Sequence, residues 1–268
     1  MAAIDKSLYE KFELESVDGS KSADISAGVV SFNYYEDVYS PMITAMVVVV
    51  NTGNVIEGDD GKLQSLYNGF PLRGGERLTI KIAGNSADNK GLELENLFVG
   101  SIENVMIDAE REMFTLKLVS REAITNETVR VGKRFLATQK ISDSVEDICK
   151  NYLSTDKLYD VDETQNPYGF FGNMRKPFTI MTMLASKSVP GNVSGRDATA
   201  GYFFFECQDG FRFKSIDSLI RNKPYPEKYV YSPGIIDSDD KTKDFKILEF
   251  STSKNQNLLE NLERGAYC

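Results

Sequence analysis

Alternating apolar and polar side chains predict three strands between residues 29 and 83. Residues 30–34 alternate in the manner of a strand with one buried face, and residues 78–82 repeat the pattern. Between them, residues 42–50 are apolar except for Thr44 and rich in β-branched side chains, which is typical of a strand covered on both faces. Pro41 interrupts the connection between the first two strands, because it fixes φ and lacks an N–H donor.

The apolar side chains of the middle strand, residues 42–50, must be shielded from solvent. Residues 45–50 carry no charge and no proline, so an exposed edge with this sequence would favour aggregation. Either the rest of its own domain or a neighbouring subunit buries this strand. The sequence of the segment alone does not distinguish between the two.

Further along, residues 92–99, 101–107 and 114–118 read as strands and residues 63–67 as a short helix. Helical spacing then predicts helices near 141–152 and from Pro177 onward, and Asp209-Gly210 marks a hairpin turn. The chain is therefore predicted to be α+β and mainly β. Its expected parts are an N-terminal arm (1–28), a β-barrel or sandwich domain (29–120), an inserted α-rich domain (121–200) and a second β region (201–268).

The amino-acid composition argues against several classes of function. The 268 residues contain no histidine, which removes the commonest general base and metal ligand, and the three cysteines are too few for a disulfide framework. Forty acidic residues against 31 basic ones give a net charge of −9, which disfavours nucleic acid and anionic membranes as partners. Neither a signal peptide nor a membrane span of ~20 residues is expected, and the thiols indicate a cytoplasmic origin.

Catalysis and metal binding are weak alternatives. Adjacent carboxylates at 36–37, 59–60 and 239–240 could suggest a hydrolase that uses paired acids, but neighbours on a strand point to opposite faces. The acidic stretch 237–244 lacks the glycine and terminal glutamate of a calcium loop. We therefore expect no catalytic residue, no cofactor and no metal.

Two sets of motifs carry a family resemblance. The first runs from Tyr34-Tyr35-Glu36-Asp37 through Ser40-Pro41 and the apolar strand to Pro71-Leu72-Arg73-Gly74-Gly75-Glu76. The second comprises residues 166–178, 184–190 and the aromatic hairpin 201–211. Together they resemble the baseplate hub protein of contractile-tailed, myovirus-type bacteriophages, and the hairpin region is similar to the hub part of bacterial secretion spike proteins.

The resemblance implies two tail-tube-like β domains around an insert, and a homotrimer that joins the sixfold tail tube to the threefold central spike around a DNA channel. The implied partners are the tail tube protein, the spike protein, other baseplate proteins and the tape-measure protein, in a virion baseplate assembled in the host cytoplasm. The chain departs from the family because it ends soon after residue 258, early for a complete second tube domain. A hub or spike component of a bacterial injection or secretion system, and a tail-associated cell-wall hydrolase, remain the alternatives.

Candidate interface residues follow from the first motif set, although most could equally be ordinary strand and turn residues. The expected contacts to neighbouring subunits or the tube are Tyr34, Tyr35, Glu36, Asp37, Tyr39, Pro41, Arg73 and Glu76.

Overall fold

The computed structural model describes residues 8–50, 56–57, 61–70, 72–84, 91–107, 112–191, 201–223, 228–231, 244–247 and 250–252. The chain divides into two compact units, Met1–Ile220 and Arg221–Cys268. In the second unit, β15 (Lys228–Tyr231) pairs in parallel with β16 (Asp244–Ile247). None of the helices within the described ranges is long and apolar enough to cross a membrane.

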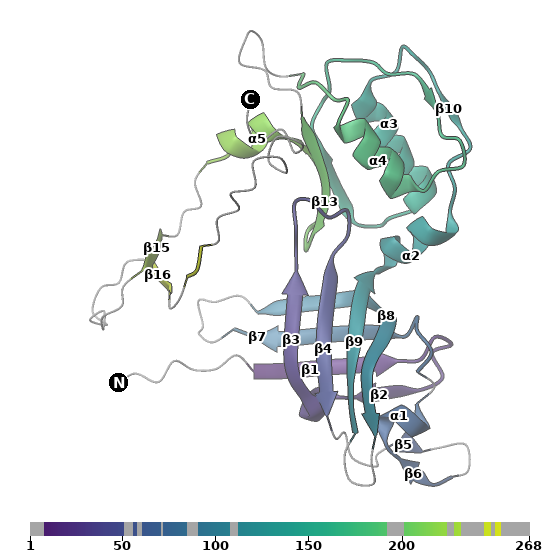
Figure 1. The fold of residues 1–268 in the computed structure, drawn as a ribbon, viewed down its shortest axis with the longest axis vertical. Coiled ribbons are helices and arrows are strands. Elements are labelled where there is room, and N and C mark those ends of the chain that lie inside the picture. The colour runs from purple at the N-terminus through teal and green to yellow at the C-terminus, as the bar shows by residue number, and fades with distance from the viewer. Residues whose placement is uncertain are drawn as a thin grey trace. The chain divides into compact units, whose positions relative to one another are not determined.

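The first unit contains two hydrophobic clusters, which define a sheet lobe (8–120) and a second lobe (121–220). The sheet lobe is one antiparallel seven-stranded sheet with the order β2-β1-β7-β8-β9-β4-β3. It curls so that β3, β4 and β9 run across the direction of β1 and β7 (Figure 1). The strands are β1 (Leu8–Glu15), β2 (Ser22–Asp24), β3 (Val29–Tyr35), β4 (Thr44–Val50), β7 (Arg77–Ala83), β8 (Leu92–Ile107) and β9 (Glu112–Ser120).

The expected N-terminal arm is wrong for the described residues from 8 onward. β1 pairs with β7 along its length, and the side chains of Phe12 and Leu14 are completely buried. Alternation within 11–15 was visible in the sequence, but the strand was too short to identify as a member of the sheet. After β2, the 3-10 turn η1 (Ser26–Gly28) leads directly into β3.

The apolar strand β4 is covered on one face only. Ala45, Val47 and Val49 are buried, whereas the alternate residues from Thr44 to Val50 are half-buried on the outer face. The expectation of a strand covered on both faces is therefore half right. In β3, a register shift after Val29 leaves Val30 exposed, so Val30 does not share the inner face of Phe32 and Tyr34.

A single long strand, β8, occupies the region predicted as two strands. Its first part pairs with β7 and its later part with β9, and the register shifts next to Gly100, where the two parts meet. A bulge lets a strand bend, so β8 can serve both halves of the curled sheet.

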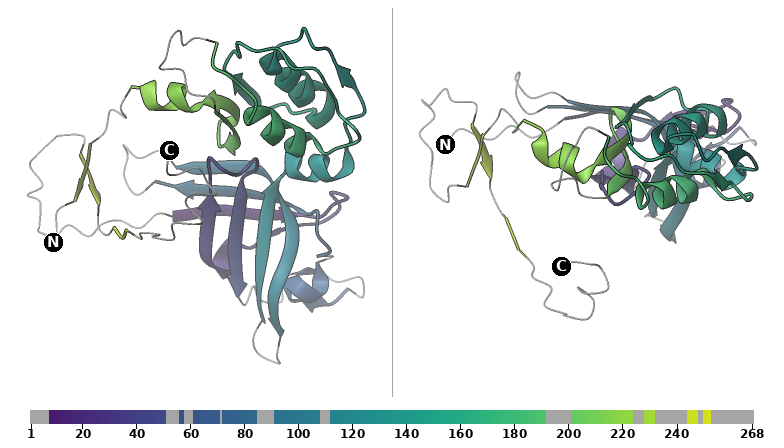
Figure 2. Two further views of the ribbon diagram at one scale, coloured as in Figure 1. Left: turned by 45° about the horizontal axis from the view of Figure 1, so that its top comes forward. Right: turned by 90° about the horizontal axis from the view of Figure 1, so that it is seen from above.

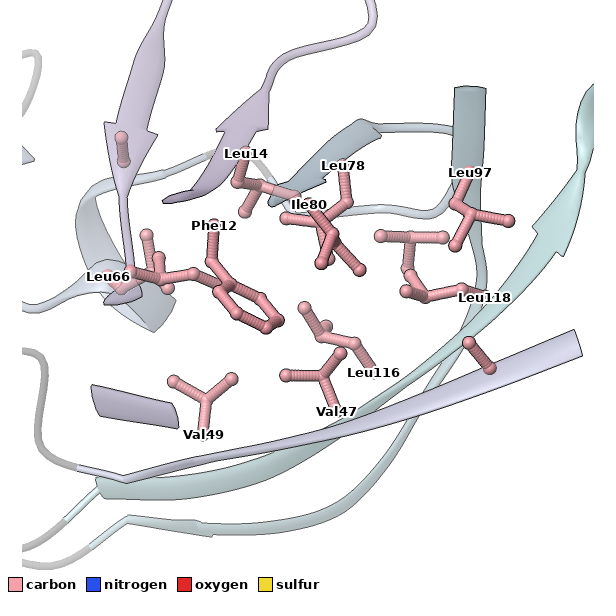
Figure 3. Packing of buried hydrophobic residues seen from close by; sticks show 14 of the residues in the cluster. Phe12, Leu14, Val47, Val49, Leu66, Leu78, Ile80, Leu97, Leu116 and Leu118 are labelled. Atoms are coloured by element: carbon pink, nitrogen blue, oxygen red, sulfur yellow. The ribbon is translucent and has the colours of Figure 1, made fainter. Parts of the chain in front are cut away.

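The two halves bury one core between them. Phe12, Leu14 and Ile80 point towards Val47 and Leu116, and Leu66 lies at the side of the cluster (Figure 3). Leu66 begins the single helical turn α1 (Leu66–Gly69), which follows the short pair β5 (Ile56–Glu57) and β6 (Leu63–Gln64).

The second lobe packs helices against a three-stranded sheet. The helices are α2 (Arg121–Thr128), α3 (Ile141–Ile148) with the π turn η2 (Cys149–Leu153), α4 (Pro177–Ala185) and α5 (Ile216–Arg221). The sheet order is β11 (Leu158–Val161), β14 (Gly210–Ser215), β13 (Tyr202–Cys207), and a separate ribbon joins β10 (Arg134–Phe135) to β12 (Phe170–Phe171). The predicted helices near 141 and 177 and the Asp-Gly hairpin are present, whereas α2 was not predicted.

The hairpin β13–β14 does not begin a separate domain at residue 201. Tyr202, Phe204, Phe211 and Phe213 are buried in the same cluster as the helices α3 and α4, so the hairpin completes the second lobe. The views in Figure 2 show β13 and β14 beside these helices. The compact unit instead ends at residue 220.

Gly210 allows the parallel pairing of β11 with β14. Its φ is +132°, and a Cβ built on it would lie 1.9 Å from the carbonyl oxygen of Leu158, its partner in the ladder. We expect Gly210→Ala to destabilise the protein by at least about 2 kcal/mol, because both the φ and the contact resist a side chain. Urea unfolding would measure the loss. Gly100→Ala is the matched control, because the nearest atom to its Cβ would be at 3.4 Å, and a comparable loss there would contradict this reading.

Candidate interaction surfaces and the joint between the lobes

The loop after β3 links the two lobes within one chain. The Glu36 carboxylate accepts hydrogen bonds from the Tyr34 hydroxyl at 2.7 Å and from the Gln208 backbone N–H at 2.6 Å. Burial and this carboxylate raise the pKa of Tyr34, so the hydroxyl stays protonated and donates. The ring of Tyr39 meets Phe203 of β13 edge-on at 5.3 Å. Tyr34 and Glu36 therefore act inside the chain.

A buried ionic cluster forms a second link. Glu206 of β13, fully buried, accepts hydrogen bonds from the Ile43 N–H at 2.9 Å and from the Ser120 hydroxyl at 2.7 Å. Its other oxygen pairs with the Lys157 ammonium. The same ammonium lies 2.9 Å from Oε2 of Glu122, an ion pair without hydrogen-bond geometry, while Oε1 accepts from Thr155. The three charges belong to the second lobe, and the donors of Ile43 and Ser120 tie the sheet lobe to them.

The electrostatics keep Lys157 and Glu122 charged. Burial alone would lower the pKa of Lys157, but the Glu206 and Glu122 carboxylates outweigh it and raise that pKa. Burial alone would raise the pKa of Glu122, but the Thr155 hydroxyl and the Lys157 ammonium hold it below its usual value. A protonated amine is neither a base nor a nucleophile, so the geometry suits cross-linking of the lobes better than catalysis.

Glu76 is not available to a neighbour. Its side chain is fully buried, and its carboxylate accepts hydrogen bonds from the backbone N–H groups of Arg73 at 2.5 Å and Gly74 at 3.0 Å. Arg73 itself is exposed. Glu76 therefore orders the turn, and the two positive-φ glycines Gly74 and Gly75 give the turn its shape.

Glu76→Gln tests this role in the turn. The amide keeps the shape of the side chain but loses the charge-assisted bonds to two N–H donors, so we expect a loss of about 1–3 kcal/mol in thermal or urea unfolding. Arg73→Gln, which leaves the backbone donors in place, should change stability by less than about 0.5 kcal/mol. Equal losses in the two variants would be inconsistent with a capping carboxylate.

The outer face of the sheet is open. In the described part of the chain no strand pairs with the free edge of β3, and Tyr35 at its end is 49% exposed. A shallow hollow of about 400 Å³ lies on this face between Tyr35, Met46, Gly100 and Val119. At the far end of β8, three consecutive apolar side chains, Val105, Met106 and Ile107, are exposed as well.

The structure separates the sequence-predicted interface residues into three groups. Tyr35, Asp37, Tyr39 and Arg73 are exposed, and Pro41 is half-buried. Tyr34 and Glu36 bind within the chain, and Glu76 is enclosed. Sequence reasoning missed Glu206, Glu122 and Lys157, although a lone glutamate in the aromatic strand YFFFEC was a visible signal.

The carboxylate pairs give no catalytic geometry in the described residues. Glu36 is engaged by Tyr34 and Gln208, and Asp37 accepts the N–H of Tyr39 in a local turn. The pairs at 59–60 and 239–240, the acidic stretch 237–243 and the end of the chain at Cys268 lie outside the described residues. Within the described ranges, no three potential ligands gather around a possible metal position.

Comparison with solved structures identifies the fold. The tail protein from Neisseria meningitidis MC58 aligns with a TM-score of 0.50 at 11% identity, over 85% of this chain and 56% of that one. The chain has a tail-protein fold. No protein-family model matches the sequence, and no curated protein matches it.

Two further alignments have lower TM-scores. The 43 kDa tail protein of prophage MuSo2 from Shewanella oneidensis gives 0.47 at 10% identity, covering 76% of this chain and 54% of that protein. The E. coli c3393 protein, a component of the type VI secretion system, gives 0.47 at 9% identity, covering 76% and 49%. The chain spans about half the length of the solved proteins that it matches.

Proposed function

We propose that this chain is a structural virion protein, the central hub of a phage baseplate, which joins the sixfold tail tube to the threefold spike and lines part of the DNA channel. The role is mechanical and without catalysis. Copies of the chain form a ring of three and contact the tail tube protein, the spike protein and other baseplate proteins, including the tape-measure protein.

The free edge of β3 carries this proposal. Its seven residues contain no charge and no proline, two of the devices by which proteins protect an edge strand from pairing, and its one bulge is confined to the start of the strand at Val29–Ser31. An edge of this kind suits a neighbouring strand from another subunit, which would also cover the outer face next to Tyr35 and Met46. Asp37, Tyr39, Pro41 and Arg73 are the remaining candidates for contact with neighbours.

The charge of the sheet lobe supports a place beside a DNA channel. Residues 8–120 contain eighteen acidic and nine basic side chains. A surface of this sign repels phosphate, so DNA would pass without adhering.

The test is the mass of the full chain in solution, alone and after co-expression with the tail tube and spike proteins. We expect a trimer that captures both. Val30→Lys with Tyr35→Lys places charge at two exposed positions of the β3 edge, and should abolish the ring while leaving the unfolding transition in place. Leu8→Lys, at an equally exposed position of β1, is the control. A strict monomer that captures neither protein would refute the proposal.

A further inference from the structure

A basic ribbon lies on the second lobe, formed by residues 130–137 and 168–175. The ribbon is held by the pairing of β10 with β12 and by the bridge between Val131 and Arg175. Beneath it, the rings of Phe135 and Phe170 stack with their centroids 4.4 Å apart, and this packing holds the two strands of the ribbon together.

The sign of the charge here is opposite to that of the whole protein. Residues 130–137 and 168–175 contain four basic and no acidic side chains, in a chain of net charge −9. Lys133 pairs with Asp147, and Arg130 donates to backbone carbonyls. Among the described residues, Arg134 and Arg175 have no carboxylate partner.

Apolar side chains project from the same ribbon. Leu136, Phe171 and Met174 are 60%, 59% and 63% exposed. Met174 has a φ of +55° directly after Asn173 at +49°, a left-handed conformation that is costly for a long side chain. The turn is hydrogen-bonded within the chain, from the Arg175 N–H to the Gly172 carbonyl at 3.0 Å and from the Met174 N–H to the Val131 carbonyl at 3.0 Å, and it holds the Met174 side chain out from the ribbon.

The sheet lobe offers a complementary surface. A hollow of about 340 Å³ is lined by Glu93, Glu95 and Asn96 of β8 and, at the joint, by Ile43, Gln208 and Lys157, whose ammonium is already paired with Glu206 and Glu122. Both glutamates are exposed and, within the described part of the chain, neither has a basic partner. Since they are two residues apart on one strand, their side chains share a face.

One copy cannot bring the two surfaces together. β10 lies at the end of the second lobe that is remote from the sheet (Figures 1 and 2). A contact between them must therefore join different copies, and because the two patches differ, repetition of the contact closes a ring if the rotation permits.

We propose that the basic ribbon of one copy docks onto the acidic hollow of the next, with Arg134 and Arg175 facing Glu93 and Glu95 and with Phe171 or Met174 entering the hollow. This inference rests on the proposed function, since it names a further contact between copies in the ring, in addition to the β3 edge. Rim charges of this kind set the orientation and the rate of encounter, so the contact weakens as salt rises.

Charge exchange tests the contact. We expect R134E/R175E to weaken ring assembly at least tenfold in sedimentation velocity at 0.15 M salt. Adding E93K/E95K to the same chain should restore ring assembly. At each contact between copies the ribbon is then acidic and the hollow basic, so opposite charges face each other again. K150E/K223E makes the same change in net charge at two exposed positions outside the ribbon and should leave assembly unchanged.

The outcomes separate the two proposals. If wild-type rings form and R134E/R175E leaves them intact, the ribbon contact is refuted and the hub proposal stands. If R134E/R175E breaks the rings but the fourfold variant fails to restore them, the acidic partner is not this hollow and the inference is again refuted. If a single-stranded DNA of 30 nucleotides binds the ribbon at 0.15 M salt, the ribbon is a nucleic-acid surface and the proposed contact with the hollow is refuted. A wild-type monomer, even with tube and spike proteins present, would overturn both proposals.

Discussion

Replacing Lys157 with methionine should destabilise the protein by about 3–5 kcal/mol at pH 7, because it leaves Glu122 and Glu206 buried without a counter-charge. Methionine keeps the length and apolar stem of lysine, so the loss reports the missing ammonium. Urea unfolding of the full chain would measure it, and a separate early transition of the second lobe would show that the joint opens first.

The loss in K157M should shrink as the pH falls. In the wild-type protein the pKa of Glu122 is held below its usual value, so this carboxylate stabilises the fold above about pH 4.3 and loses that effect as pH falls through its folded pKa. Without the ammonium, burial raises the pKa of Glu122, so that Glu122 becomes protonated as the pH falls and its repulsion with Glu206 is relieved. The difference in the free energy of unfolding between K157M and the wild type therefore becomes smaller from pH 7 towards pH 4.

Two controls define the effect in K157M. Lys176→Met removes one partner of an exposed pair with Glu127 and should cost less than about 1 kcal/mol. The triple variant K157M/E122Q/E206Q removes all three charges and should recover much of the loss. If K176M lost as much unfolding free energy as K157M, burial of the Lys157 cluster would not explain the effect of K157M.

Phe12→Ala should cost about 3–5 kcal/mol, because it removes a completely buried ring from the centre of the sheet lobe. Phe12 packs edge-on against Phe32 at 5.7 Å and near Tyr9 at 5.1 Å, so the cavity would border several aromatic side chains that relax little. Thermal or urea unfolding of the full chain is the measurement.

Leu8→Ala on the same strand is the matched control for Phe12. Leu8 is 64% exposed, so its truncation should change stability by less than about 0.5 kcal/mol. If both variants unfold like the wild type, residues 8–15 are an arm after all, as the sequence alone suggested. A large loss in Phe12→Ala alone establishes them as part of the sheet.

Local patterns predicted the strands better than their partners. Alternation located β7, β9 and the hairpin β13–β14, and Pro177 marked the start of α4, since these signals are contained in short windows. The membership of β1 in the sheet depends on pairing with β7 more than sixty residues away, which no local window reveals. The exposed position of Val30 depends on a bulge set by tertiary packing.

The joint was harder to predict than the strands. Glu206 is satisfied by Ile43, Ser120 and Lys157, which lie 163, 86 and 49 residues away. The sequence indicated a polar residue in an aromatic strand, but only the fold shows what satisfies it. Conversely, Glu36 was selected for a contact between subunits because it belongs to the first set of family motifs, whereas its carboxylate binds inside the chain.

Because β8 is bonded to β7 along one flank and to β9 along the other, a pull along its axis must break two rows of hydrogen bonds in shear. Bonds loaded in parallel resist force far better than bonds opened one after another. If the chain is the hub proposed above, in a tail that contracts, it would experience this kind of load, and the shared strand would let the two halves of the sheet bear it together.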